Sequence, residues 1–203
     1  MTTPYQQLLD DNEKLAKKIY IILNNLRLRL SKTSVKQIKK ETERAFYKIE
    51  QAAFAMLLRN AKAYRQDITE DEVKKWLNEY YIVTQYVYYN ELKRKEQRYI
   101  ETLITLKDND YSYNGIDAIT AQKRLARGLK KQIEEYGVMI VDKARTTVFK
   151  AQGVLKLKWV SQTDKNVCAE CIKRNGKIYK IDKVPPKPHY GCRCYMVKVN
   201  NND

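Results

Sequence analysis

Apolar residues recur every three or four positions along residues 1 to 150, a spacing that is typical of amphipathic helices. A first helix is expected from Pro4, after a Thr3 N-cap, to about Leu30. Its apolar stripe consists of Leu8, Leu15, Ile19, Ile22 and Leu26. A second helix is expected to begin after Ser34, because Ser34 and Gln37 match a capping box. That helix carries a seam spaced as in a coiled coil: Val35, Ile38, Thr42, Ala45, Ile49, Ala52 and Met56.

A further capping box at Thr69 and Glu72 predicts the start of a third helix. Its pattern predicts the longest helical stretch of the chain, continuing to about Leu106. Residues 107–115 form a polar linker that ends in Asn114-Gly115, a strong turn signal. A fourth helix is expected from about Asp117 to Lys150.

The apolar period changes after Gly153, where alternating residues predict short strands at 155–160, 177–181 and 194–199. The fold class is therefore mainly α, with long N-terminal helices followed by a small β-domain, α+β overall. The expected organisation is a long-helix region at 1–110, a connecting helix at 111–153 that packs on the C-terminal module, and a small β-domain at 154–203.

All four cysteines and the single histidine fall within this β-domain. Cys168 and Cys171 are spaced as a metal-binding knuckle, and His189, Cys192 and Cys194 follow as H-x₂-C-x-C. A tetrahedral Zn²⁺ held by four cysteines, or by three cysteines and His189, fits this inventory. We therefore expect structural zinc, held either by the four cysteines or by three of them with His189. Two disulfides, or reduced cysteines that are merely buried, are the alternative interpretations.

The chain carries 40 lysines and arginines against 24 acids, a net charge of +16. Such an excess favours an anionic partner, with nucleic acid the commonest and an anionic membrane surface the second. A lysine-rich composition that only reflects codon usage is the alternative. No apolar run reaches the length of a membrane span.

The last 53 residues are denser in charge, with 11 lysines and arginines against 4 acids. We expect non-specific contact between phosphates and the basic residues of the β-domain: Lys156, Lys158, Lys173, Arg174, Lys177 and Arg193. Basic clusters at 93–98 and 123–131 are either solvated faces or further phosphate contacts. Tyrosines at 80–89 are expected to bury their rings between helices rather than to stack on bases.

The order of these motifs also carries a resemblance. Residues 159–164 (WVSQTD) precede Cys168-x₂-Cys171, and Gly176-Lys177, Pro185-Pro186 and the H-x₂-C-R-C motif follow. This order resembles the C-terminal domain of tailed-phage minor head proteins, the Mu F-like head-morphogenesis family, over about residues 140–199. Ala144-Arg145-Thr146 resembles the family's entry into the domain, but Thr147 stands where the family usually has glutamate.

The resemblance implies a minor head protein that is incorporated with the portal during head assembly. Double-stranded phage DNA, portal and capsid proteins are the implied partners, without a membrane. The implied location is the virion head, and the bacterial host cytoplasm during assembly. Alternatives are a zinc-dependent DNA-binding regulator and a domain associated with a toxin or nuclease. We expect no enzymatic activity, since the sequence offers no Ser/His/Asp, Cys/His or paired-carboxylate constellation.

Overall fold

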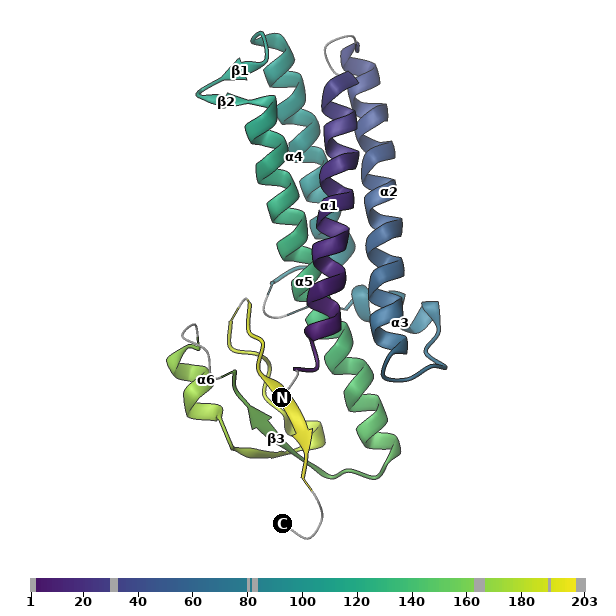
Figure 1. The fold of residues 1–203 in the computed structure, drawn as a ribbon, viewed down its shortest axis with the longest axis vertical. Helices are drawn as coiled ribbons and strands as arrows, with labels where there is room; N and C mark the ends of the chain where they lie inside the picture. Colours follow the sequence, from purple (N-terminus) through teal and green to yellow (C-terminus); the bar gives the residue numbers. More distant parts are fainter. Residues whose placement is uncertain are drawn as a thin grey trace.

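The computed structural model describes residues 3–29, 33–79, 81, 84–162, 167–189 and 191–199. They form an elongated helical bundle with a small strand-containing module at one end (Figure 1). The fold class expected from the sequence is confirmed. Within the described residues, no helix combines the length and the apolar character needed to cross a bilayer.

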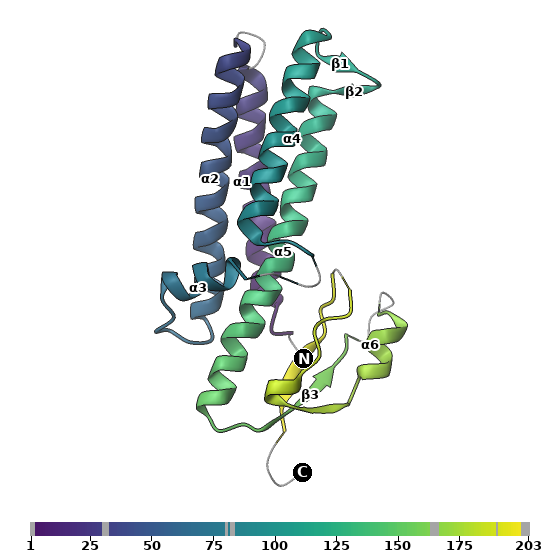
Figure 2. The same ribbon diagram turned by 180° about the vertical axis from the view of Figure 1, so that it is seen from behind.

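Long helices run along the bundle, each antiparallel to the next long helix in the chain (Figures 1 and 2). Their bounds are α1 Gln6–Arg29, α2 Val35–Lys62, α4 Tyr88–Asp108 and α5 Ala118–Ala151. A shorter helix, α3, spans Glu70–Leu77 at the end of the bundle nearer the module. Helix α1 packs mainly against α5 and α2, so α5 is part of the bundle as well as the path to the module.

The predicted helix starts are confirmed where the side chains cap the backbone. Ser34 with Gln37 forms the capping box of α2, and Thr69 with Glu72 forms that of α3. The seam of α2 faces the core, with Ile38, Thr42, Ala45, Ile49 and Met56 buried, but Val35 at its start is exposed. These local signals therefore located the helix starts and the buried face correctly.

The predicted single helix from residue 70 to about Leu106 is wrong, because α3 ends at Leu77 and α4 begins at Tyr88. A tight reversal separates the two helices, in which the Gln85 backbone N–H donates to the Tyr81 carbonyl (2.8 Å). Gln85 has a positive φ of 60°, which a helix does not tolerate. The longest helix is α5.

The tyrosines around this reversal bury or partly bury their rings as expected, except Tyr86. Tyr88 is fully buried, and its ring meets that of Tyr136 edge-on with centroids 5.2 Å apart. Tyr81 also packs on Tyr136, and Tyr86 is exposed and lies beneath the Arg94 guanidinium. Tyr80 lies outside the described residues. The aromatic groups thus form core contacts between α4 and α5.

The predicted polar linker ends in the turn of a two-stranded hairpin, which is formed by β1, Ser112–Tyr113, and β2, Ile116–Asp117. Its two-residue turn is Asn114-Gly115, with φ of 50° and 70°. Asn-Gly is the preferred pair for such a turn because both residues tolerate positive φ. Asp117 then caps α5 by accepting from the Thr120 N–H (2.6 Å).

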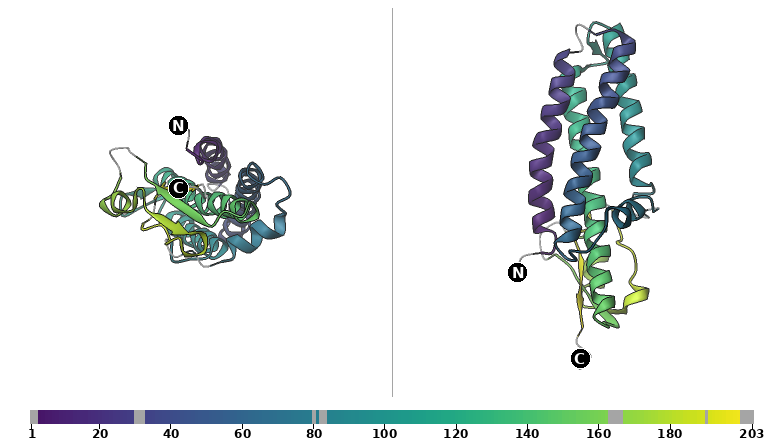
Figure 3. Two further views of the ribbon diagram at one scale, coloured as in Figure 1. Left: turned by 90° about the horizontal axis from the view of Figure 1, so that it is seen from below. Right: turned by 90° about the vertical axis from the view of Figure 1, so that its right-hand side faces the viewer.

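The C-terminal module contains a three-stranded antiparallel sheet in the order β4-β3-β5, which confirms the strands expected from the alternating pattern. Its elements are β3 Lys156–Val160, α6 Ala169–Arg174, β4 Ile178–Lys180, the short 3₁₀ helix η2 Ile181–Lys183 and β5 Tyr195–Lys198. Leu157 and Trp159 of β3 are buried on one face, and Trp159 forms a second small core with three buried cysteines. The views in Figure 3 place this sheet beside the last turns of α5. The proposed division at residues 110 and 153 stays a prediction.

Candidate metal centre

The first half of the centre is the turn that begins α6. Cys168 is the N-cap residue of this helix, and its Sγ accepts a hydrogen bond from the Cys171 backbone N–H at 3.3 Å. This bond is the main reason why the pKa of the Cys168 thiol is lowered. The knuckle therefore favours a thiolate, the form of cysteine that binds metals.

The second half lies on the segment that leads into β5. His189 Nε2 is 3.3 Å and Cys192 Sγ is 3.7 Å from Cys171 Sγ. In a tetrahedral zinc site two sulfurs are separated by about 3.8 Å, and a sulfur and a nitrogen by about 3.6 Å. The distances around Cys171 are thus close to those that one ion would impose.

Five ligand atoms gather in two overlapping groups that share Cys171. One group contains Cys168, Cys171 and His189, the other Cys171, Cys192 and Cys194, and within each group the atoms lie within 4.8 Å of one another. Cys171, Cys192 and Cys194 are buried, and Cys168 is half-buried. The structure therefore brings together every metal ligand predicted from the sequence, and the cluster could hold a metal ion. The choice of four from these five residues stays open.

The thiols of Cys192 and Cys194 are electrostatically linked. A hydrogen bond from Cys192 lowers the pKa of Cys194 to about 5, and the same bond, with burial, raises the pKa of Cys192. One thiolate thus forms readily in this buried pocket, and a second negative charge beside it needs a counter-charge. A divalent cation supplies that counter-charge.

Neighbouring polar groups fix the backbone around the cluster. The Ser161 hydroxyl donates to the Cys171 carbonyl (2.6 Å), and the Ser161 N–H donates to Asn175 Oδ1 (2.9 Å). The Cys194 Sγ lies 3.6 Å from Ser161 Oγ. Contacts of this kind hold metal ligands in place before the ion binds.

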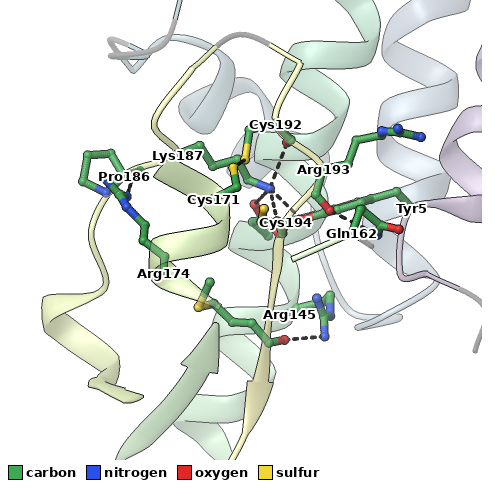
Figure 4. Close-up of polar contacts among 12 residues, drawn as sticks. Tyr5, Arg145, Gln162, Cys171, Arg174, Pro186, Lys187, Cys192, Arg193 and Cys194 are labelled. Atoms are coloured by element: carbon green, nitrogen blue, oxygen red, sulfur yellow. Dashed lines mark hydrogen bonds and ion pairs between the residues drawn. The ribbon is translucent and has the colours of Figure 1, made fainter. Parts of the chain in front are cut away.

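Lys187 joins the cluster to the helical bundle (Figure 4). Its Nζ donates to the carbonyl of Cys194 (2.6 Å) and to the hydroxyl of Tyr5 (2.8 Å), and it pairs with Asp142 Oδ2 at 3.0 Å. Tyr5 precedes α1, and its hydroxyl donates to Asp142 Oδ1 on α5 (2.6 Å). One lysine therefore connects three segments that are far apart in the sequence.

Arg145 of α5 makes a second connection between the bundle and the module. Its Nη2 donates to the Met196 carbonyl in β5 at 2.8 Å, and its guanidinium lies 5.8 Å from the centre of the Tyr195 ring. Sequence reasoning noted Arg145 only as part of a motif and missed Tyr5, Asp142, Ser161 and Lys187. Lys187 lies in a proline-rich segment beside His189, the only sequence signal that pointed to it.

The basic residues predicted to touch nucleic acid fall into two groups. Lys156 and Lys158 project from the exposed face of β3, opposite Leu157 and Trp159, and Lys173 and Lys177 are also exposed. Lys156 pairs across the sheet with Lys180, a further exposed lysine. Together they give the outer face of the module a positive charge.

The two arginines of the predicted set are less exposed to solvent than these lysines. Arg174 pairs with Glu170 (2.9 Å), donates to the Pro186 carbonyl (2.7 Å) and lies over the Trp159 ring. Arg193, between two candidate ligands, is half-buried. Arg174 thus supports the module internally, and the contact of both arginines with nucleic acid stays a prediction.

Comparison with protein families finds one match that contains the whole centre. Residues 115–197 match the family described as Phage Mu protein F like protein. The resemblance to phage head-morphogenesis proteins is thereby confirmed over this part of the chain. The match begins in the β1–β2 turn, so it takes in all of α5 and extends well before residue 140, where the resemblance in the motifs begins. The match indicates that the protein is related to phage head or capsid components.

No curated protein and no solved structure gives a significant match to the chain.

Proposed function

We propose that the protein is a minor head protein of a tailed phage that is incorporated with the portal during head assembly. The observation that carries the proposal is the Mu F-like match over residues 115–197, which spans α5, the sheet and all five candidate metal ligands. Its partners would be portal and capsid proteins, and its location the virion head after assembly in the host cytoplasm. The role is structural rather than enzymatic.

We propose that the module holds one structural Zn²⁺. The ligands are Cys168, Cys171, Cys192 and Cys194, with His189 as the alternative fourth ligand. Support comes from the sulfur-rich donor set and from the burial of three cysteines, which suits a closed, four-coordinate site. A sheet of three short strands with a small core has little stability of its own, so the ion would contribute most of it.

This role of the ion supports the division of the chain expected from the sequence. Residues 154–203 would form the metal-dependent module, 1–110 the long-helix region, and 111–153 the helix that carries the module. Lys187 and Arg145 are the contacts that support docking of the module on that helix. The bundle would then present the module in a fixed orientation.

The outer face of the sheet would bind packaged double-stranded DNA without sequence preference. Lys156 and Lys158 are exposed there with Lys180 opposite Lys156, and Lys177 is exposed just before β4; lysines that contact phosphates act as point charges independent of the base sequence. Binding should weaken steeply with salt because each phosphate contact releases counterions.

The experiment that tests the function is mass spectrometry of purified virions and procapsids of the phage that encodes the chain. The protein should be present at low copy number and should co-purify with the portal from procapsids. Its absence from both particles would refute the proposal. Elemental analysis of the purified protein tests the metal separately, and about one zinc per chain is expected.

A further inference from the structure

A groove of about 540 Å³ lies between α4 and α5, in the part of the bundle nearer the hairpin and remote from the module. Its walls carry Lys95 and Arg98 from α4 and Arg124 from α5, and Leu125 contributes to its apolar floor. The absence of a side chain at Gly128 helps to keep it open, since the nearest atom to a β-carbon there would be Lys95 Nζ at 3.9 Å. No acidic residue lines it.

The cations of this groove are incompletely neutralised. Glu91 pairs with Lys95 (2.9 Å) but is shared with Arg94 (2.7 Å), so one carboxylate serves two cations. Arg98 and Arg124 form no ion pair with any acid in the described part of the chain. Glu101 borders the adjoining hollow next to Arg98 without reaching it as an ion pair. The groove therefore keeps a net positive charge.

Two other hollows of the molecule differ because acidic residues line them. In the hollow between α1 and α2, Glu41 pairs with both Arg29 and Arg44. In the hollow between α5 and the module, Asp142 pairs with Lys187. Cations that stay unpaired beside an apolar floor are costly to bring together unless an anion binds them.

The positive charge also continues beyond the groove. Lys123 and Arg127, on the same helix as Arg124, are exposed, and Arg127 Nε donates only to the Lys123 carbonyl (3.4 Å). The cations thus form a strip that covers about one turn of each helix and carries more charges than a single small anion neutralises. A polyanion with regularly spaced charges fits such a strip.

We propose that this groove, with its flanking cations, binds the phosphate backbone of double-stranded DNA. The choice of DNA as the polyanion rests on the proposed function. Along α5, Arg124 is separated from the helix end at Ala151 by about 40 Å, at 1.5 Å per residue. The protein therefore has two DNA-binding surfaces, one on the bundle and one on the sheet, and contacts DNA at two places along its length.

An acidic protein segment is the competing occupant. A peptide that bound here would need several apolar anchors, because interface affinity concentrates in buried side chains. The cations are instead spread over both helices and extend past the floor. This distribution favours a backbone of phosphates, which needs charge but few pockets.

The test compares three double variants of the full chain by fluorescence anisotropy with a labelled duplex of about 30 base pairs, at several salt concentrations. The groove variant is Arg98→Gln with Arg124→Gln, and the sheet variant is Lys156→Gln with Lys158→Gln. The matched control is Lys36→Gln with Lys39→Gln, which removes two exposed lysines from α2. Circular dichroism verifies that each variant keeps its helix content.

The groove variant should lose at least about tenfold in affinity at 0.1 M salt, and its slope of log K against log salt should fall by about two. The control should change affinity by less than about twofold, as expected for exposed, screened charges that do not line the groove. A groove variant that behaves like the control would overturn the groove but leave DNA binding by the sheet intact.

Failure of the unmodified protein to bind the duplex at about 0.05 M salt would refute DNA as a partner, and the groove proposal with it. Loss of polyglutamate binding in the groove variant, with DNA binding unchanged, would assign the groove to an acidic protein instead. The separate arms thus distinguish failure of the groove from failure of the proposed function.

Discussion

Gly137 of α5 lies directly against Leu8 of α1, so closely that a β-carbon at position 137 would be only 2.6 Å from Leu8 Cδ1. It would also meet Leu57 Cδ2 of α2 at 3.3 Å. Leu8 and Leu57 are fully buried, so neither has free space to move into. Three helices, α1, α2 and α5, therefore meet at this glycine.

Gly137→Ala should therefore destabilise the protein. Overpacking a core costs about 1–3 kcal/mol, against a gain of about 1 kcal/mol in helix propensity. We expect a net loss of up to about 2 kcal/mol in the free energy of unfolding, measured with urea. Gly128→Ala is the matched control, because its β-carbon would have only Lys95 Nζ within 4 Å. That control should be neutral or more stable by up to about 1 kcal/mol, and equal losses in both variants would contradict the packing argument.

Lys187→Met tests the connection between the module and the bundle. The substitution leaves Asp142 without its cation and the Cys194 carbonyl without the lysine donor. The free energy of unfolding should therefore fall by about 2–4 kcal/mol. The module should also become more sensitive to protease than the bundle. Lys183→Met removes an exposed lysine from the same segment and should have almost no effect. Unchanged stability of Lys187→Met would show that the network does not hold the module in place.

Removal of the metal should unfold the module and spare the helices. Chelation should shift the fluorescence of Trp159, which is packed against the cysteines, while the far-ultraviolet dichroism of the bundle changes little. Loss of a structural zinc removes on the order of 10 kcal/mol of apparent binding free energy. A chelated protein whose Trp159 signal is unchanged would refute a structural role for the ion.

Cys171→Ser should abolish zinc binding whichever residue is the fourth ligand, because Cys171 belongs to both groups of candidate ligands. His189→Ala separates the two ligand sets. Full zinc content in that variant indicates four cysteines, and loss of zinc indicates three cysteines and His189. Elemental analysis of both variants gives the result directly. Zinc retained at full occupancy in Cys171→Ser would contradict the assigned centre.

Glu135 gives the protein a pH dependence near neutrality. Burial raises the pKa of this carboxyl from 4.5 to about 7, although the Gly191 backbone N–H hydrogen-bonds to it and lowers the pKa in part. Because the pKa of Glu135 is higher in the folded protein than in the unfolded chain, protonation of this carboxyl favours the folded state. This contribution to stability is complete below about pH 4.5 and is lost as the pH rises through about 7. The full loss is about 3–4 kcal/mol, since one pKa unit corresponds to about 1.4 kcal/mol.

The measurement is the difference in unfolding free energy between Glu135→Gln and the unmodified protein at each pH. Taking this difference removes the contribution of thiol protonation at the metal site, which is common to both proteins. The variant should gain about 2–3 kcal/mol relative to the unmodified protein between pH 5 and pH 8. A difference that is flat across this range would contradict the raised pKa.

The sequence by itself determined the features that depend on neighbouring residues. Ser34 with Gln37, and Thr69 with Glu72, located helix starts because a capping box satisfies backbone donors within one turn. Alternation located the three strands of the module, and the cysteine spacing named all five candidate ligands that the fold brings together. Asn114-Gly115 marked a turn, although only the structure showed the hairpin around it.

The tertiary structure decided what depends on residues that are distant in the chain. The apolar pattern continues through residues 78–87, but α3 ends at Leu77 and α4 begins at Tyr88, which packs on Tyr136 of α5. Tyr5 and Lys187 meet although 182 positions separate them, and no local signal records that pairing. The same holds for Arg98 and Arg124, which form no ion pair among the residues that the structure describes, a property of the packed surface. Periodicity and caps act within one or two turns, whereas packing selects which faces and charges come together.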